Sequence, residues 1–197
     1  MDLDDNDMAG YLEENENMQE EQWRMRNGPW QKRADVLRFE QINGLKRNAK
    51  LILSVGCGPK EPIAIGATHA CDIALSAEKY LRAQGWTGEF KQCSCDKLPY
   101  PDKFFDFAVM SEVIGHLPTL EDCRNAILEL NRVSKRWLIT TPWINRDQGN
   151  TEPTHKHFFD EKSIHALVPD WVLLMVRYDI FLFITRCVKD GCSDKKA

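Results

Sequence analysis

Two glycines and an acidic residue in the first half of the chain have the types and spacing of a nucleotide-binding site. The aliphatic run Leu51-Ile-Leu-Ser-Val55 ends in Gly56 and Gly58, and Asp72 follows sixteen residues after Gly56. Glycines let the backbone turn tightly and approach a ligand closely because they lack a Cβ. A carboxylate at the tip of the neighbouring strand can accept both hydroxyls of a ribose. The pattern therefore indicates an adenosine-type ligand, although glycine pairs also mark ordinary turns.

Asp72 has a second interpretation, as the cap of a helix that begins near Ser76. Ser76 can supply that cap itself, and Lys79 rather than Glu stands at the position that a capping box requires. We therefore favour ligand binding for Asp72.

The elements that must position these residues alternate regularly along the chain. Strands are predicted at 51–55, 67–71, 89–93, 104–110, 137–141, 171–177 and 181–188, and helices at 30–47, 76–84, 119–135 and 161–167. The segment after the glycines, with Pro59, Pro62 and Gly66, has room for little more than one helical turn. This order predicts a doubly wound α/β fold with a mostly parallel sheet that ends in a C-terminal antiparallel hairpin.

Length and composition predict one globular domain. The chain has 197 residues, of which 43% are hydrophobic, and no apolar run reaches the ~20 residues of a membrane helix. The acidic first residues do not resemble a secretion signal, so we expect a cytoplasmic protein. Seven cysteines fit reduced thiols, and Cys93 and Cys95, the only close pair, lack two further ligands at matching spacing. No metal site is therefore predicted.

Acidic residues are concentrated at the N-terminus. Residues 1–23 contain nine Asp or Glu and no Lys or Arg. We expect a flexible arm over 1–28, a single domain over 29–190 and a short tail over 191–197. Trp23 and Trp30 leave open the alternative that the arm is a lid or a partner-binding segment. The remainder is mildly basic but lacks the Lys/Arg stripe of a nucleic-acid binder.

Six short motifs follow one another beyond the first strand. They are Val55-Gly-Cys-Gly-Pro59, Cys71-Asp-Ile73, Leu98-Pro-Tyr-Pro-Asp-Lys-Phe-Phe-Asp106, Ser111-Glu-Val-Ile-Gly-His-Leu117, Glu129-Leu-Asn-Arg-Val133 and Thr140-Thr-Pro142. In this order they resemble class I S-adenosylmethionine-dependent methyltransferases, most closely the type 11 group that includes many small-molecule methyltransferases. The resemblance covers about residues 45–188. It implies a Rossmann-like fold with a seven-stranded sheet, S-adenosylmethionine as cofactor and S-adenosylhomocysteine as product.

The resemblance also implies where the cofactor lies. The glycine turn would contact the methionine part, Asp72 the ribose and the segment 94–96 the adenine, while Ser111 and Glu112 would face the cofactor and the acceptor. The complete set of predicted cofactor-binding residues is Ser54, Gly56, Cys57, Gly58, Asp72, Ile73, Ser94, Cys95, Asp96, Ser111 and Glu112.

Three positions depart from the family pattern. Ser54 stands where the family usually has an acidic residue, and Lys60 replaces a frequent third glycine. Ser94 occupies the usual place of the adenine-binding acid, although a shift of one or two residues would give that role to Asp96. These departures leave open the alternative that the chain is a degenerate protein, which binds the cofactor without turnover.

The expected reaction is direct displacement at the cofactor's methyl carbon by an oxygen, nitrogen or carbon nucleophile. Alignment of the reactants can contribute ~7–11 kcal/mol, so positioning matters more than a special nucleophile. A hydroxyl acceptor needs a base, for which His116, His155 and His157 are the candidates; a structural role for His116 is equally open. The polar segment 145–159, with its His155-Lys-His-Phe158 pattern, is the candidate for acceptor recognition.

Three functions remain open. A small-molecule acceptor is favoured by the polar segment and the compact size, and the alternatives are methylation of protein or RNA and cofactor binding without turnover. Met110-Ser-Glu-Val113 follows the fourth strand in place of an Asn-Pro-Pro-Tyr-like motif, which argues against the amino-methylating DNA enzymes.

Overall fold

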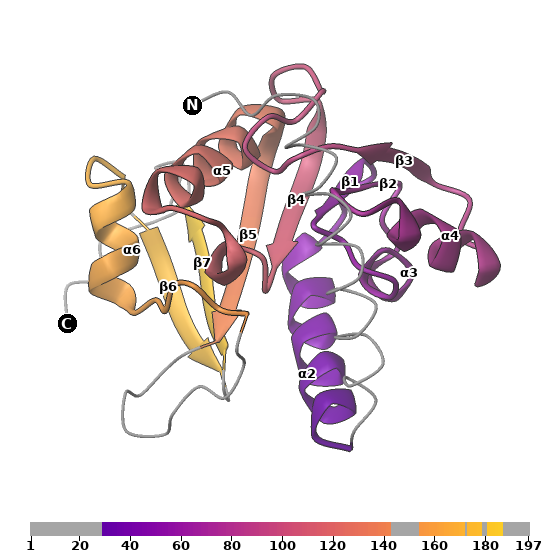
Figure 1. Cartoon of the computed structure of the whole chain (residues 1–197), viewed down its shortest axis with the longest axis horizontal. Coiled ribbons are helices and arrows are strands. Elements are labelled where there is room, and N and C mark those ends of the chain that lie inside the picture. Colours follow the sequence, from indigo (N-terminus) through magenta and orange to yellow (C-terminus); the bar gives the residue numbers. More distant parts are fainter. Residues whose placement is uncertain (1–28, 143–153, 172, 179–180, 187–197) are drawn as a thin grey trace. The chain divides into compact units, whose positions relative to one another are not determined.

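The computed structural model describes residues 29–142, 154–171, 173–178 and 181–186 (Figure 1). They fall into two compact units that divide between Cys95 and Asp96. The predicted arm and tail lie outside the described residues, so both stay predictions, as does the single domain over 29–190. No helix among the described residues is long and apolar enough to cross a membrane.

The described residues of the first unit form three parallel strands and three helices. Its elements are α2 (Pro29–Lys46), β1 (Ile52–Val55), α3 (Glu61–Ile65), β2 (His69–Asp72), α4 (Leu75–Ala83) and β3 (Glu89–Gln92). β2 pairs in parallel with β1 on one side and β3 on the other. All four residues of β1 are buried, as its aliphatic sequence predicts. Helix α3 has only five residues, which confirms the expected single turn.

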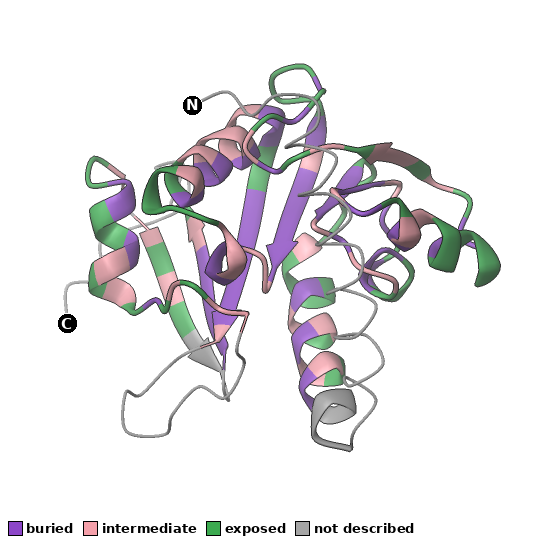
Figure 2. Cartoon of the chain, in the orientation of Figure 1, coloured by how far each residue is buried: buried purple, intermediate pink, exposed green. Residues whose placement is uncertain are grey.

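The described residues of the second unit form four strands, together with helices and a 3-10 turn. Its elements are β4 (Phe105–Ser111), η1 (Ile114–His116), α5 (Leu120–Val133), β5 (Ser134–Pro142), α6 (Glu161–Leu167), β6 (Leu173–Tyr178) and β7 (Phe181–Arg186). β4 and β5 are parallel, whereas β7 is antiparallel to both β5 and β6. Figure 2 shows that β4 and β5 are buried over most of their length. The carboxyl ends of β4 and β5 therefore rest on a packed core.

The fold is α/β with a seven-stranded, mostly parallel sheet, as predicted. The strand order is β3-β2-β1 in the first unit and β4-β5-β7-β6 in the second. The predicted C-terminal hairpin is β6 and β7, and its antiparallel pairing is confirmed. One predicted boundary is wrong: Lys135, expected at the end of a helix, lies in β5. Ser134 pairs with Phe105 of β4, so strand pairing begins directly where α5 ends.

The predicted cap of α4 is also wrong. The helix begins at Leu75, and the residue before it, Ala74, is extended and provides no side-chain cap. The backbone N–H of Ala74 instead donates to Asp72 Oδ1 at 3.1 Å. Ser76 lies inside the helix, where its buried Oγ has no hydrogen-bond partner. The turn between β2 and α4 is therefore organised by Asp72, which leaves Ser76 no role as a cap.

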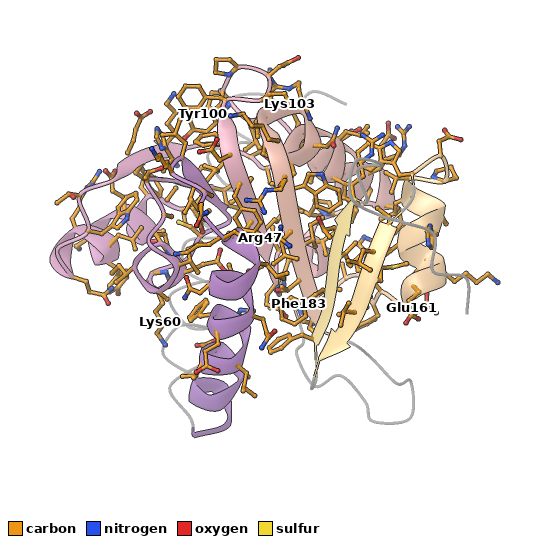
Figure 3. The ribbon with its side chains drawn as sticks, turned by 180° about the vertical axis from the view of Figure 1, so that it is seen from behind. Arg47, Lys60, Tyr100, Lys103, Glu161 and Phe183 are labelled. Carbon is orange, nitrogen blue, oxygen red and sulfur yellow. The ribbon has the colours of Figure 1, made fainter. Side chains whose placement is uncertain are left out.

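Arg132 of α5 holds the loop that leads into β4. Its guanidinium donates to the carbonyl oxygens of Leu98 at 2.9 Å and Tyr100 at 2.8 Å. It also pairs with Glu129 at 2.6 Å and Asp102 at 2.9 Å. Hydrogen bonding to Arg132 lowers the pKa of the Glu129 carboxyl. Tyr100 lies in this loop (Figure 3) and packs edge-on against Phe105, so Arg132 fixes the entry to β4.

We expect Arg132→Met to lower the free energy of unfolding by about 1–2 kcal/mol at pH 7, because two carbonyls and two carboxylates lose their donor. A carboxyl whose pKa is depressed by folding stabilises above its unfolded pKa, and that contribution is lost as pH falls through the folded value. The difference in unfolding free energy between the variant and the wild type should therefore be smaller at acidic pH. Urea unfolding at pH 7 and pH 3 measures it, with the exposed Arg124→Met as control. A difference that is independent of pH would contradict the role of Glu129.

Candidate functional site

The glycine turn after β1 is bound to the end of β2. Gly56 and Gly58 have φ angles of 60° and 52°, in the left-handed region that favours glycine. Between them, the Cys57 N–H donates to the Cys71 carbonyl at 3.2 Å. The Gly58 N–H donates to Asp72 Oδ2 at 3.0 Å. The structure thus brings together the three residues from which the sequence predicted a nucleotide site.

Asp72 is the last residue of β2 and only 3% exposed. Its two oxygens accept hydrogen bonds from the backbone N–H groups of Gly58 and Ala74. The next residue, Ile73, is held by Gln92, whose side-chain amide donates to its carbonyl at 2.9 Å. Asp72 therefore anchors the glycine turn at the carboxyl end of β2, the edge where ligands bind in parallel α/β sheets.

Ser54 and Glu61 form a hydrogen-bonded pair that the sequence analysis missed. Ser54 lies in β1 and is fully buried, and its hydroxyl donates to Glu61 Oε1 at 2.7 Å. Glu61 is the first residue of α3 and is 5% exposed. The only sequence signal for this pair is a glutamate in an otherwise apolar helical turn directly after the glycines. The Ser54 hydroxyl is therefore turned to Glu61, and a contact between Ser54 and the cofactor stays a prediction.

The glycine turn has a negative environment. Burial raises the pKa of the Cys57 thiol well above its usual value, and the charges of Asp72 and Glu61 raise it further. Both carboxylates are thus close enough to Cys57 to act on it. Cys57 stays a neutral thiol whose backbone, rather than its sulfur, shapes the turn.

The segment predicted to border the adenine follows β3. Ser94 is exposed, Cys95 is buried and Asp96 is half-buried. Ser94 and Cys95 belong to the first unit, and Asp96 is the first residue of the second. Their contact with adenine stays a prediction. Within the described part of the chain, no three His, Cys, Asp or Glu residues are grouped so that they could hold a metal ion.

Ser111 and Glu112 lie at the carboxyl end of β4, where ligands bind in parallel α/β sheets. Ser111 is 8% exposed, and its buried Oγ has no hydrogen-bond partner. Glu112 has a φ of 59°, which is strained for a residue with a side chain. Its backbone N–H donates to the Thr140 carbonyl at 2.9 Å, and its Oε1 accepts from Thr140 Oγ1 at 2.8 Å. A buried hydroxyl without a hydrogen-bond partner, next to a residue with a strained backbone, is typical of a ligand-binding position.

The strain at Glu112 predicts a difference between two substitutions. Glu112→Gly and Glu112→Ala both remove the hydrogen bond from Thr140, but only alanine keeps a Cβ in the left-handed region. We expect the glycine variant to be more stable by about 0.5–1 kcal/mol, since its flexibility in the unfolded state offsets part of the relief. Urea unfolding of both variants measures the difference. Equal stability, or a more stable alanine variant, would show that the backbone relaxes at this position.

The three candidate histidines gather around Gly115 in the second unit. His116 lies in η1, a 3-10 turn between β4 and α5. Its ring centroid is 4.3 Å from that of His155. The N–H groups of Lys156 and His157 both donate to the Gly115 carbonyl, at 2.8 and 3.1 Å. The described part of the predicted acceptor region therefore contacts Gly115 and His116; its residues 145–153 lie outside the described residues.

A side chain at position 115 would crowd this arrangement. A Cβ added there would lie 3.0 Å from His155 Cδ2 and 3.2 Å from the His157 carbonyl oxygen. His157 Nε2 is buried without a hydrogen-bond partner. Of the other two histidines, His165 is exposed on α6, and His69 lies in the first unit with Nε2 3.5 Å from Glu89. Neither belongs to the group around Gly115.

Comparison with known proteins identifies the class. Residues 53–137 match the family model of a methyltransferase domain. The chain resembles magnesium protoporphyrin IX methyltransferase from Synechocystis PCC 6803 with bound S-adenosylmethionine (16% identity, TM-score 0.63, 94% of this chain and 99% of that one). It also resembles the DhpI–SAM–HEP complex (14% identity, TM-score 0.68, 92% and 97%). A possible histamine N-methyltransferase from Thermotoga maritima is similar as well (14% identity, TM-score 0.59, 75% and 86%). No curated protein sequence matches the chain.

The segment 53–137 thus matches a methyltransferase domain, and the chain has the fold of S-adenosylmethionine-dependent methyltransferases, as the six motifs predict. The residues of the first unit fit S-adenosylmethionine. A buried carboxylate at the end of β2 suits a ribose, and a turn with two left-handed glycines admits a ligand close to the backbone.

Proposed function

We propose that this methyltransferase acts on a small molecule and that the histidines around Gly115 serve the acceptor. The observation that carries the proposal is the pairing of His116 and His155, with ring centroids 4.3 Å apart, a few residues beyond the carboxyl end of β4. Imidazoles so placed can orient a polar acceptor and take its proton.

The tautomer of His116 follows from its neighbour Thr154. His116 Nδ1 lies 3.3 Å from the Thr154 carbonyl oxygen and 3.2 Å from its Oγ1. A carbonyl oxygen can only accept, so the tautomer with the proton on Nδ1 is the one that uses this contact, and we assign it to His116, which places the lone pair on Nε2. We assign Nε2 of His116 as the base that removes a proton from an acceptor hydroxyl or amine, with His155 and His157 as neighbouring polar groups.

When bound, S-adenosylmethionine supplies an activated methyl group on a sulfonium. The chain's own contribution is to bind, to align and to move one proton. For cofactor binding we propose Gly56, Cys57 and Gly58 as the turn, Asp72 for the ribose and Ser54 through Glu61; roles for Ile73, Ser94, Cys95, Asp96, Ser111 and Glu112 are retained from the sequence. Alignment of the reactants accounts for most of the expected acceleration.

The proposal of a small-molecule acceptor has support from two of the similar structures. The Synechocystis protein is named as methylating magnesium protoporphyrin IX, and the Thermotoga protein as a possible methyltransferase of histamine. Both named acceptors are small molecules. The expected cytoplasmic location stays a prediction from the sequence.

Incorporation of label from methyl-labelled S-adenosylmethionine tests the proposal. The purified chain is incubated with a metabolite extract, an RNA fraction and a protein fraction, and the products are separated by size. We expect label in a small molecule. Label in RNA or protein would favour a macromolecular acceptor, and binding of the cofactor without label in any fraction would favour a protein without turnover.

A further inference from the structure

Three cysteines lie together at the carboxyl ends of β1, β2 and β3, next to the glycine turn. Cys71 is the third residue of β2, and its carbonyl accepts the N–H of Cys57 at 3.2 Å. Cys93 directly follows β3, and its N–H donates to the Asp72 carbonyl at 3.1 Å. The proposed function gives none of these three thiols a role.

The thiols of Cys71 and Cys93 contact each other. Cys71 pairs with Lys91 across the two parallel strands, and Cys93 lies two residues further on, so both thiols belong to one face of the sheet. A hydrogen bond between the two thiols, together with burial, raises the pKa of Cys71 well above its usual value. A hydrogen bond that favours the protonated form of a group is one that this group donates, so Cys71 is the donor and the Cys93 sulfur the acceptor.

The two thiols differ in their access to solvent. Of the five cysteines that the structure describes, all are free, and Cys93 alone is half-buried while the others are buried. Cys71 itself is 0% exposed. Thiol reactivity follows exposure as well as ionisation, so Cys93 is the thiol that a reagent from solution reaches first. Cys71 then lies in contact with whatever forms on the Cys93 sulfur.

We propose that Cys71 and Cys93 form a redox-active pair, which a small disulfide molecule oxidises to an intramolecular disulfide. In the first step the Cys93 sulfur attacks one sulfur of the small molecule, forms a mixed disulfide and releases one thiol. In the second step the Cys71 sulfur attacks Cys93 and releases the other thiol. The two cysteines are oxidised, the small disulfide is reduced to two thiols, and the two cysteine protons end on those thiols.

The new bond would act on Asp72 from two sides. Asp72 directly follows Cys71, and its carbonyl is bound to the N–H of Cys93. Replacing a contact between thiols by a covalent bond draws the two sulfur atoms together, so the ends of β2 and β3 must shift. The shift moves the Asp72 carboxylate, which also accepts the Gly58 N–H at 3.0 Å. Oxidation should therefore weaken cofactor binding; this consequence rests on the proposed cofactor site, whereas formation of the disulfide does not.

Peptide mapping tests the pairing. The purified full chain is reduced, treated with oxidised glutathione, alkylated and digested with trypsin. Cys71 is the only cysteine of the tryptic peptide 61–79, and Cys93 lies in the peptide 92–97 together with Cys95. We expect these two peptides to be joined in the wild type and in Cys95→Ser, and separate in Cys93→Ser. Dithiothreitol should separate the joined peptides.

Calorimetric titration with S-adenosylhomocysteine tests the effect on the cofactor site. We expect oxidation to raise Kd ~10-fold or more, because the Asp72 carboxylate no longer meets the ribose hydroxyls, and dithiothreitol to restore it. Cys93→Ser should bind the ligand equally well before and after the treatment. The matched control is Cys123→Ser in the second unit, where the thiol donates to the Ile114 carbonyl at 3.3 Å. This variant should respond to oxidation as the wild type does. Thermal melting confirms that each variant is folded.

The outcomes distinguish this inference from the proposed function. Oxidised wild-type protein without the joined peptides, or with peptide 61–79 linked instead to peptide 51–60 and its Cys57, would overturn the pairing. A disulfide between Cys71 and Cys93 that leaves the affinity for S-adenosylhomocysteine unchanged would overturn its effect on Asp72. Failure of the reduced protein to bind the ligand would overturn the cofactor site, and the peptide map would still decide whether the pair exists.

Discussion

Asp72→Ala is expected to weaken binding of S-adenosylmethionine by about 1.5–3 kcal/mol, roughly a 10- to 150-fold rise in Kd. The substitution removes the acceptor proposed for the ribose hydroxyls. It also removes the bond from the Gly58 N–H to Asp72 Oδ2, 3.0 Å long in the structure, and so loosens the glycine turn. The two losses act in the same direction. Calorimetry with the purified chain measures the combined effect.

A matched carboxylate makes this result specific. Glu89 lies at the amino end of β3 with its side chain 52% exposed, far along the strand from the register position opposite Asp72. We expect Glu89→Ala to bind the cofactor as the wild type does. If Asp72→Ala keeps wild-type affinity while remaining folded, Asp72 does not belong to the cofactor site.

His116→Ala is expected to lower kcat by ~10²- to 10⁴-fold on an acceptor that must lose a proton, the usual contribution of a positioned base. Cofactor affinity should stay within about twofold, because the histidine is assigned to the acceptor. The rate is measured with the acceptor fraction that takes up label, and the affinity by calorimetry. The result specific to this assignment is a large fall in kcat with little change in cofactor affinity.

The exposed His165 on α6 provides the control. His165→Ala should retain wild-type kcat. His116→Gln tests the proton transfer separately, because its amide can hydrogen-bond to Thr154 but cannot act as a base. Full activity of His116→Gln would assign His116 a structural role, the alternative that the sequence left open.

The sequence predicted the parts of the fold that depend on local pattern. The buried aliphatic strand β1, the five-residue α3 and the β6–β7 hairpin all follow from runs of residue type and from glycine and proline positions. Asp72 could be placed beside the glycines because parallel strands bring their carboxyl ends to one edge of a sheet. These relations need no knowledge of side-chain packing.

Contacts between elements were beyond the sequence analysis. Ser54 and Glu61 are seven residues apart on a strand and a helix, and nothing in their spacing predicts that their side chains meet. The predicted Ser76 cap was wrong. Asp72 accepts a hydrogen bond from the N–H of Ala74, so the turn before α4 is closed by a residue that precedes Ser76 in the chain. Local sequence preference alone could not decide whether Asp72 or Ser76 accepts the hydrogen bond at the start of this helix.

The gathering of histidines around Gly115 was predictable only in part. The sequence marked His116, His155 and His157 as candidates, but 38 residues separate His116 from Thr154, which fixes its tautomer. Gly115 gave no signal, since its importance lies in the ring of His155 that a Cβ would touch. Such close approaches depend on the tertiary structure.

The most direct test of the cofactor site is a crystal structure of the protein with S-adenosylhomocysteine. Density for the ligand at the glycine turn, with the ribose hydroxyls on Asp72, is the result that this account predicts. Ligand density away from Gly56 and Gly58, with the Asp72 oxygens bound only to the backbone, would contradict it.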